Sequence, residues 1–567
     1  MANLFKKATH EIGASDPILT RIAAEDKVPW YRKRNMRFLY FMLFPTCMGI
    51  ELTSGFDSQL INALQIVPSW IDYFGNPQGS LKGIIAAAYS LGAILSLPFI
   101  PFVNEKFGRR GSIFGGSCIM VIGALVQGFA RNGQCPAVPQ YSEENFLADL
   151  VSLVGMYIAA RIILGFGIPT CIVSGSALIG ELGYPKERPV LTSLFNVSYF
   201  IGQIAAAGIT FGTNNIASNW GWRIPSLLQM APSLLQITFV YFVPESPRWL
   251  VTKDRSEEAY DILVKYHAEG DRQSEFVRAE MAQIQTTIHI EIEAKKKGWS
   301  YVFSTPGMRR RVFLSSFLGL FTQWSGNTLI SYYLGDLLAM IGHTDSVFKQ
   351  KINLAGSCWA LVAGVTVALL VPRFKRRTMY LACTCSLLLV YISWTISMQQ
   401  ALKAISEGRQ NNAAGAATIA FIFIYSPCYN LGYNALTYTY LVEIWPFAER
   451  SRGIAIFQFF GRGAGFFTTF VNPIGLKNIS WKWLITYCCW LAFEICFVWF
   501  FFPETSGRTL EELAFLFEDK ALADKAVVAV EKVVHHGDID PVSIDPKNIE
   551  VGHAEIVEQV PEKGSRV

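Results

Sequence analysis

Two acidic residues, Glu51 and Asp57, lie within an apolar segment at residues 41–65. A carboxylate at membrane depth is costly unless it is paired, hydrated or protonated. We therefore interpret Asp57 as a candidate group that binds and releases a proton inside a membrane. The alternative is that Asp57 ends a helix near the outer surface and is merely solvated. A role for Glu51 does not follow from its position alone.

The composition of the whole chain favours a membrane setting. The 567 residues are 51% hydrophobic, 14% aromatic and 16% charged, which is too apolar for an ordinary soluble protein of this size. The net charge of +5 is small, and Lys and Arg are concentrated in particular loops instead of forming a basic face. Nucleic acid is therefore excluded as an expected partner.

The motifs do not indicate an enzyme. The seven His residues form no ligand-spaced cluster, no nucleophile has an evident base, and no glycine-rich nucleotide-binding loop is present. Most of the eleven Cys residues lie inside apolar runs or lack metal-ligand spacing, which predicts packing residues. We expect no cofactor and no metal ion.

Apolar runs long enough to cross the membrane set the predicted fold class. A helix needs about twenty residues to cross roughly 30 Å of hydrocarbon. The sequence predicts an all-α membrane protein with twelve such spans, near residues 38–60, 83–103, 112–130, 148–175, 190–212, 223–243, 312–340, 354–372, 379–402, 413–441, 452–474 and 483–502.

One long polar insertion, residues 245–311, separates the sixth and seventh spans and contains twelve Lys and Arg residues. By the positive-inside rule it faces the cytosol, and both termini do so as well. Helix-forming composition predicts short amphipathic helices at 256–265 and 275–297, with a solvated linker as the alternative. The remaining predicted parts are a cytoplasmic segment at 1–37 without a signal peptide, six-helix bundles at 38–244 and 312–503, and a largely disordered tail at 504–567.

Three short patterns occur twice, in the same order and at a nearly constant offset. The pairs are 104–110 with 373–377, Glu181 and Arg188 with Glu443 and Arg450, and 244–248 with 503–508. This repetition predicts two six-helix halves related by an axis along the membrane normal, with a binding site between them. Independent placement of basic loops explains the Arg clusters but not the paired Glu residues.

The charged residues in these patterns are predicted to lie at cytoplasmic helix ends. We expect them to bind helix ends together in one state and to separate in another, which provides a gate for alternating access. The competing explanation is charge that only directs membrane insertion. The predicted gate residues are Arg109, Arg110, Glu181, Arg188, Glu245, Arg248, Glu443, Arg450 and Glu504.

These residues also carry a family resemblance. Residues 38–516 resemble the sugar porter family of the major facilitator superfamily. The matching motifs are Gly55-Phe56-Asp57, Phe107-Gly108-Arg109-Arg110, Arg161 with Gly165 and Gly167, Pro185-Lys186-Glu187-Arg188, Pro244-Glu245-Ser246-Pro247-Arg248, Gln323-Trp324-Ser325-Gly326-Asn327 and Pro503-Glu504-Thr505. Residues 323–327, 331–333 and 470–474 look most like fungal lactose-permease-type transporters, which implies uptake of sugars, including disaccharides, across the plasma membrane.

The resemblance implies proton coupling at Asp57, with Arg161 as the cation that stabilises the ionised carboxylate. A guanidinium that moves toward or away from a buried Asp changes the proton affinity of the carboxyl group. The alternative for Arg161 is a residue that reaches the end of its helix.

Sugar hydroxyls require amide and hydroxyl partners and an aromatic wall. The predicted substrate residues are Asn196, Gln203, Gln323, Trp324, Asn327, Thr328, Tyr332, Asn434 and Tyr438. Asn196, Gln323, Thr328, Asn434 and Tyr438 match contacts that the resemblance implies, whereas the others follow from their side-chain types. Hydrogen bonding between helices is the alternative for the amides. Arg462 replaces a Trp of many relatives. Three roles remain open for it: pairing with a carboxylate, binding an anionic substrate, or extending to an interface.

The resulting hypothesis is a monomeric proton–sugar symporter of the plasma membrane, with sugar, proton and lipid as its partners. A facilitative sugar carrier is the alternative within transport. A sugar sensor that does not transport is the alternative from another class.

Overall fold

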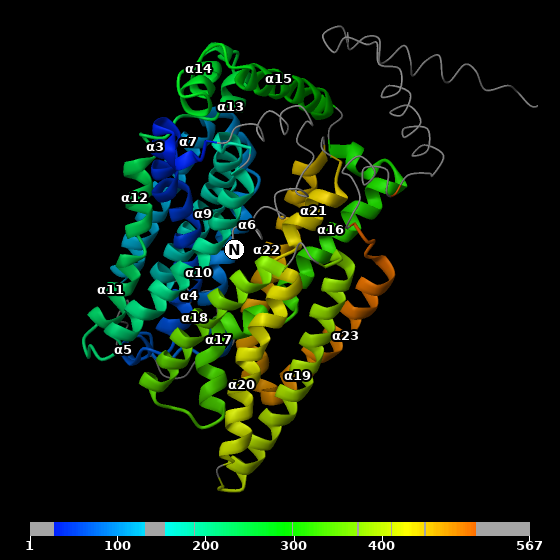
Figure 1. The fold of residues 1–567 in the computed structure, drawn as a ribbon. Helices are drawn as coiled ribbons and strands as arrows, with labels where there is room; N and C mark the ends of the chain where they lie inside the picture. Colours follow the sequence, from blue (N-terminus) through cyan, green and yellow to red (C-terminus); the bar gives the residue numbers. More distant parts are fainter. Residues whose placement is uncertain are drawn as a thin grey trace, which may run out of the picture. The chain divides into compact units, whose positions relative to one another are not determined.

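The computed structural model describes residues 28–130, 154–185, 187–296, 299–370, 374–409, 411–446, 449–505 and Phe517. All regular elements in these ranges are helical, in agreement with the predicted class (Figure 1). They lie in Met1–Leu513, the first of two units into which the chain divides. The predicted tail, apart from residues 504, 505 and 517, lies outside the described residues.

The first half of the helical unit comprises α3 to α12. Its elements are a short 3-10 turn Trp30–Arg32, α3 Arg34–Leu43, a π-helical turn Phe44–Met48, α4 Gly49–Leu64, α5 Pro68–Tyr73, α6 Gly79–Ser96, α7 Ile100–Gly128, α9 Gly155–Leu182, α10 Arg188–Thr213, α11 Trp220–Leu228 and α12 Ala231–Phe239. Proline occupies the first or second position of α5, α7, α10 and α12, where its missing N–H breaks no helical hydrogen bond.

The second half comprises α16 to α23. Its elements are α16 Pro306–Trp324, α17 Asn327–Met340, α18 Ser346–Leu370, α19 Arg376–Ser406, α20 Asn412–Tyr429, a π-helical turn Asn430–Asn434, α21 Thr437–Ile444, α22 Arg450–Ile479, a 3-10 turn Ser480–Lys482 and α23 Trp483–Phe501. Between the halves lie α13 Pro247–Thr252, α14 Ser256–His267, α15 Glu275–Lys296 and a 3-10 turn Trp299–Phe303. Helices α14 and α15 confirm the helices predicted in the polar insertion.

By length and mean hydropathy, the described residues contain six helical stretches able to cross a membrane. They are Gly79–Ser96, Ile100–Gly128, Gly155–Leu182, Arg376–Ser406, Asn412–Leu441 and Arg452–Phe501, the last of which includes both α22 and α23. Several other predicted spans are divided: the first by a π turn, the sixth between α11 and α12, and the seventh at Gly326. The count of twelve spans therefore stays a prediction.

Glycines allow helices to approach at backbone distance. A Cβ at Gly55 would lie 1.9 Å from the carbonyl oxygen of Tyr199, and one at Gly202 would lie 2.1 Å from that of Leu52, so α4 and α10 touch through their backbones. Small residues at such crossings are the usual means by which membrane helices pack, because lipid supplies no hydrophobic drive between them.

The helices of the polar insertion pack against the first half. In Figure 1, α13, α14 and α15 lie at the end of the helices where α3 is found. The His267 ring contacts Glu280 through Nδ1 at 2.7 Å and the Leu182 carbonyl through Nε2 at 3.2 Å. The Glu269 carboxylate accepts backbone N–H bonds from Asn35 at 3.0 Å and Met36 at 3.1 Å. The insertion is therefore a docked helical layer and not only a linker.

The substitution Gly202→Ala tests the backbone contact between α4 and α10. The new methyl group overlaps the Leu52 carbonyl, so the helices must separate, and we expect a loss of about 2 kcal/mol or more of stability. The measurement is the thermal unfolding midpoint of the purified protein. Gly208→Ala on the same helix is the control, because a Cβ there meets nothing within 4 Å. Equal midpoints for the two variants would contradict the contact.

Candidate functional site

The predicted proton-coupling residues form a buried ion pair. Arg161 Nη1 of α9 donates to Asp57 Oδ1 of α4 at 3.0 Å, and the side chains are 0% and 4% exposed. Neither residue lies at a helix end, because α4 continues to Leu64 and α9 begins at Gly155. The geometry therefore argues against both alternatives, a solvated helix-end Asp57 and an Arg161 that reaches the end of its helix.

The partners of this ion pair are incomplete. Asp57 Oδ2 and Arg161 Nε and Nη2 are buried and have no hydrogen-bond partner among the described residues. The guanidinium instead stacks near the Tyr89 ring, 5.3 Å from its centre. Gly165 permits this approach, because a Cβ there would lie 1.9 Å from the Tyr89 carbonyl oxygen. A charge pair with unfilled polar atoms in a low-dielectric setting is suited to exchanging a proton or a partner.

Tyr332 of α17 faces this ion pair from the second half. Its side chain lies close to Ser58 and interacts electrostatically with Asp57 and Arg161. The position of Tyr332 depends on a break in the predicted seventh span at Gly326. The φ of Gly326 is +95°, a left-handed backbone conformation that glycine adopts without strain. A Cβ at Gly326 would also lie 1.7 Å from the Tyr391 hydroxyl oxygen, so two constraints select glycine.

The other predicted residues of this segment divide by their contacts. Trp324 uses its indole N–H to donate to the Ala464 carbonyl at 3.2 Å, and Thr328 accepts from Asn472 at 3.4 Å. Both contacts lie within the second half and resemble the helix–helix alternative. Asn327 accepts from Ser331 Oγ at 3.2 Å. Gln323 is half-buried next to Gly465, where a Cβ would lie 3.2 Å from its Oε1.

The remaining predicted substrate residues come from α10, the π turn and α21. Gln203 is half-buried, whereas Asn434 and Tyr438 are exposed. Asn434 donates to Asn430 Oδ1 at 2.5 Å, and the Tyr438 hydroxyl accepts from Gln458 at 2.6 Å. The side chain of Asn196 lies outside the described part of the structure.

Two charged residues without an assigned role, from opposite halves, lie within electrostatic range of each other. Glu51 of α4 and Arg462 of α22 interact electrostatically, and Arg462 also interacts with Tyr438. Both are half-buried, and no ion pair joins them among the described residues. The tertiary structure therefore places Arg462 toward the first half.

A buried amide cluster between the halves was not singled out by sequence reasoning. Gln59 and Asn62 of α4 donate to Asn353 Oδ1 of α18 at 2.5 and 2.9 Å. Asn353 is 2% exposed, and its Nδ2 has no partner among the described residues. The predicted eighth span began one residue later, at 354, whereas α18 begins at Ser346. The sequence signal that could have indicated this cluster is an amide side chain next to a predicted apolar span.

Four of the predicted gate residues, Arg109, Arg110, Glu181 and Glu245, come together in the first half. Arg109 Nη2 lies 3.1 Å from Glu181 Oε1, and the Glu245 carboxylate accepts the backbone N–H groups of Arg109 at 2.9 Å and Arg110 at 3.2 Å. Gly108, at φ +75°, bends α7 so that these N–H groups point at Glu245. Burial raises the pKa of the Glu245 carboxyl, and the N–H groups of Ser246, Arg109 and Arg110 oppose that rise.

The second half repeats this arrangement. Arg376 Nε lies 3.4 Å from Glu443 Oε1, and Glu504 accepts the backbone N–H groups of Arg376 at 3.0 Å and Arg377 at 3.2 Å. Arg376 and Arg377 belong to the repeated pattern but were missing from the predicted gate. Arg450 begins α22, and Arg248 is half-buried in α13. Arg188 begins α10, but its side chain is not described.

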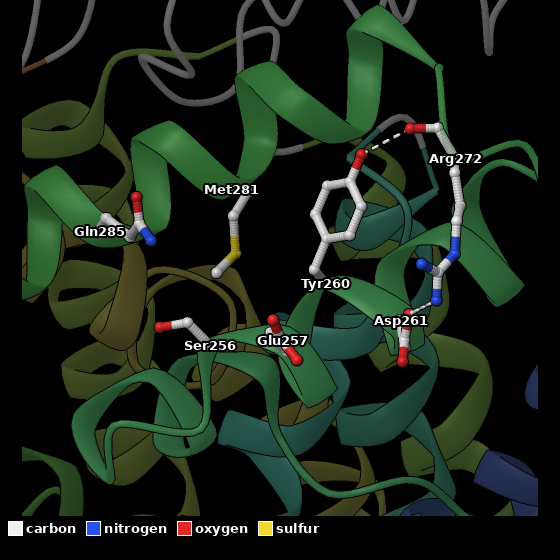
Figure 2. A pocket seen from close by; sticks show the side chains of 7 residues that line it. All are labelled: Ser256, Glu257, Tyr260, Asp261, Arg272, Met281 and Gln285. Carbon is white, nitrogen blue, oxygen red and sulfur yellow. Dashed lines mark hydrogen bonds and ion pairs between the residues drawn. The ribbon is translucent and has the colours of Figure 1, made fainter.

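A shallow pocket of about 370 Å³ lies between α14 and α15 (Figure 2). Tyr260 donates to the Arg272 carbonyl at 2.7 Å, and Arg272 pairs with Asp261 at 2.5 Å. None of the predicted transport residues lines this pocket.

Comparisons with known proteins agree with this fold. Residues 42–517 match the family described as sugar (and other) transporter. The high-affinity glucose transporter of Kluyveromyces lactis is 27% identical over 512 residues, with 85% of each chain covered. The low-affinity glucose transporter HXT3 of Saccharomyces cerevisiae is 24% identical over 78% of this chain and 74% of its own length.

Solved structures share the fold. The inward open conformation of the xylose transporter XylE from E. coli matches with a TM-score of 0.66 and 22% identity, and the match covers 85% of this chain and all of XylE. The XylE structure with bound 6-bromo-6-deoxy-D-glucose, described as a proton:xylose symporter, also gives 0.66. The family match makes the chain a multi-pass membrane protein that belongs to a family of transporters. The chain therefore belongs to the sugar (and other) transporter family, the sugar porters of the major facilitator superfamily.

Proposed function

We propose that this protein imports a sugar, a disaccharide or a hexose, across the plasma membrane by proton symport with alternating access. The observation that carries the proposal is the buried ion pair of Asp57 and Arg161 with its unpartnered polar atoms. The names of relatives support the cargo, since two are glucose transporters, and one structural neighbour is described as a proton:xylose symporter.

In the proposed mechanism, Asp57 holds the proton. Protonation removes the charge that Arg161 pairs with, so the guanidinium is left with buried donors to satisfy. Protonation of Asp57 therefore favours a conformation that supplies hydrogen-bond acceptors for those guanidinium donors, or that opens space around them. Because Tyr332 of the second half faces the same pair, a change at Asp57 reaches both halves.

The sugar is proposed to bind between the halves beside this pair. Tyr332, Gln203, Gln323 and Asn327 supply hydroxyl and amide groups, and Asn353 adds a donor without a partner among the described residues. Such groups match the hydroxyls of a sugar, each of which both donates and accepts. Trp324 and Thr328 are proposed to shape the site, since their polar atoms are already engaged.

One proton supplies useful work. A membrane potential contributes about 2.3 kcal/mol per 100 mV, and a pH gradient adds about 1.4 kcal/mol per unit. Together, 100 mV and two pH units give about 5 kcal/mol, which supports accumulation on the order of a thousandfold.

The clusters around Glu245 and Glu504 are proposed to be the cytoplasmic gate. Each fixes helix ends within its own half, so each half can move as a unit. A facilitative sugar carrier, in which the buried pair of Asp57 and Arg161 has only a structural role, is the second candidate. Likeness to fungal lactose-permease-type transporters suggests disaccharides as the first sugars to examine.

The substitution Asp57→Asn separates symport from facilitated transport. A symporter loses uphill uptake, because the neutral amide carries no proton, but it keeps sugar exchange across a vesicle membrane. The measurement is uptake of a panel of labelled sugars at two external pH values, with and without a protonophore.

Asp72→Asn is the matched control, since Asp72 is exposed on α5 and has no place in the proposed mechanism. Wild-type accumulation that survives the protonophore, or Asp57→Asn accumulation equal to wild type, contradicts coupling. Absence of flux for every sugar, with binding retained, favours a sensor.

Two adjacent tyrosines give a test of the substrate site. Tyr332→Phe removes the hydroxyl that faces the ion pair, and we expect the KM for sugar to rise about tenfold, as for the loss of one hydrogen bond near a charged group. Tyr333→Phe is the control, because its hydroxyl donates to the Thr469 carbonyl at 2.5 Å and is fully buried. It should lower thermal stability and leave KM near wild type. The reverse pattern would contradict the proposed site.

A further inference from the structure

An ion pair joins the two halves near the start of α6. Lys82 Nζ lies 2.6 Å from both carboxylate oxygens of Asp336 in α17. The side chains are 11% and 37% exposed, so the pair is only partly accessible to water. Neither residue belongs to the proposed proton, sugar or gate residues.

Further polar contacts between the halves lie near the same helix ends. Gln350 Nε2 of α18 donates to the Ala63 carbonyl of α4 at 2.8 Å. Asn214, which follows α10, donates to Ser346 Oγ at the start of α18 at 3.2 Å. These contacts use the C-terminal ends of α4 and α10, and Lys82 lies at the N-terminal end of α6.

The charged clusters proposed as the gate, on α7 and α9 and on α19 and α21, have a different character. Arg109 and Glu181 both belong to the first half, and Arg376 and Glu443 both belong to the second. Thus the described ion pair between α6 and α17 bridges the halves, whereas each pair in the gate clusters stays within one half. The polar contacts that bridge the halves are concentrated around the ends of α4 and α6 that flank α5.

We propose that Lys82 and Asp336 form a latch that holds the halves together on the α5 side of the protein and must open for substrate to pass there. The latch requires the alternating access of the proposed function but no particular substrate or coupled ion. Its two members come from different halves, so any rocking that opens this side stretches or breaks the Lys82–Asp336 contact.

The charges and exposure of the pair suit a latch that opens repeatedly. A partly exposed ion pair adds only a modest bias, so breaking it does not trap one state. Lys349 interacts electrostatically with both Lys82 and Asp336, and it offers Asp336 a second cation. Salt screens such exposed charges, so ionic strength should favour the open latch.

The test measures how often a buried position between the halves becomes accessible. Ala63→Cys places a thiol at a position that is 0% exposed and whose carbonyl accepts from Gln350. Purified full-length protein in detergent is treated with a water-soluble maleimide, and mass spectrometry follows labelling of the peptide that contains residue 63. The experiment needs no sugar. The latch proposal can therefore be contradicted while the proposed sugar transport is confirmed, and the transport proposal can be contradicted while the latch is confirmed.

We expect Lys82→Ala and Asp336→Ala each to raise the labelling rate two- to fivefold, the range of a partly exposed ion pair. Lys82→Asp and Asp336→Lys should each raise the rate further, because like charges then face each other, and combining the two should return it toward wild type. High salt should raise the rate of wild type and leave that of Asp336→Ala unchanged.

Arg409→Ala is the control, because Arg409 pairs with Glu407 within the second half. Each variant must keep the elution profile and unfolding midpoint of its parent, so that a folding defect is recognised. The proposal is overturned if the single variants label at the parent rate, or if the charge-swapped protein labels as fast as the product of the two single effects predicts.

Discussion

The burial of one carboxylate and one guanidinium constrains the organisation of the first half. Asp57 and Arg161 come from α4 and α9, and each would be a severe cost in the membrane without the other. Helix packing must therefore bring two particular helix positions to hydrogen-bonding distance. The glycines at the crossings of α4 with α10 and of α6 with α9 let the helices that carry Asp57 and Arg161 pack closely against their neighbours, because the backbones touch where a side chain would otherwise stand.

The ion pair of Asp57 and Arg161 does not use all of its hydrogen-bonding groups. One carboxylate oxygen and two guanidinium nitrogens remain without partners among the described residues. A fully satisfied pair fixes one arrangement, whereas an incomplete pair responds when a proton, a water molecule or a hydroxyl supplies a new partner. This is the property expected of a charge pair that takes part in transport instead of one that only stabilises the fold.

Polar contacts elsewhere fall into two classes. The Glu245 and Glu504 clusters bind backbone N–H groups and an adjacent Arg within one half, and they occur at equivalent places in the repeated sequence. These contacts stiffen each half. The Lys82–Asp336 pair and the amides around Asn353 join one half to the other, so they depend on how the halves are arranged. Internal stiffness together with modest contacts between halves is what rigid-body rocking requires.

The sequence by itself determined the helical class, the helices of the polar insertion, the family, the residue pair Asp57 with Arg161, and the membership of Arg109 and Glu181 in one gate group. Local composition and repeated motifs carry that information, because membrane depth makes charged residues conspicuous. Only the tertiary structure decided which way the side chains of the broken seventh span face. Tyr332 lies close to Ser58 and interacts electrostatically with Asp57 and Arg161, whereas Trp324 and Thr328 bond within the second half. It also brought Asn353 to Gln59 and Lys82 to Asp336, because contacts between residues more than 250 positions apart depend on packing across the halves, which no local pattern records.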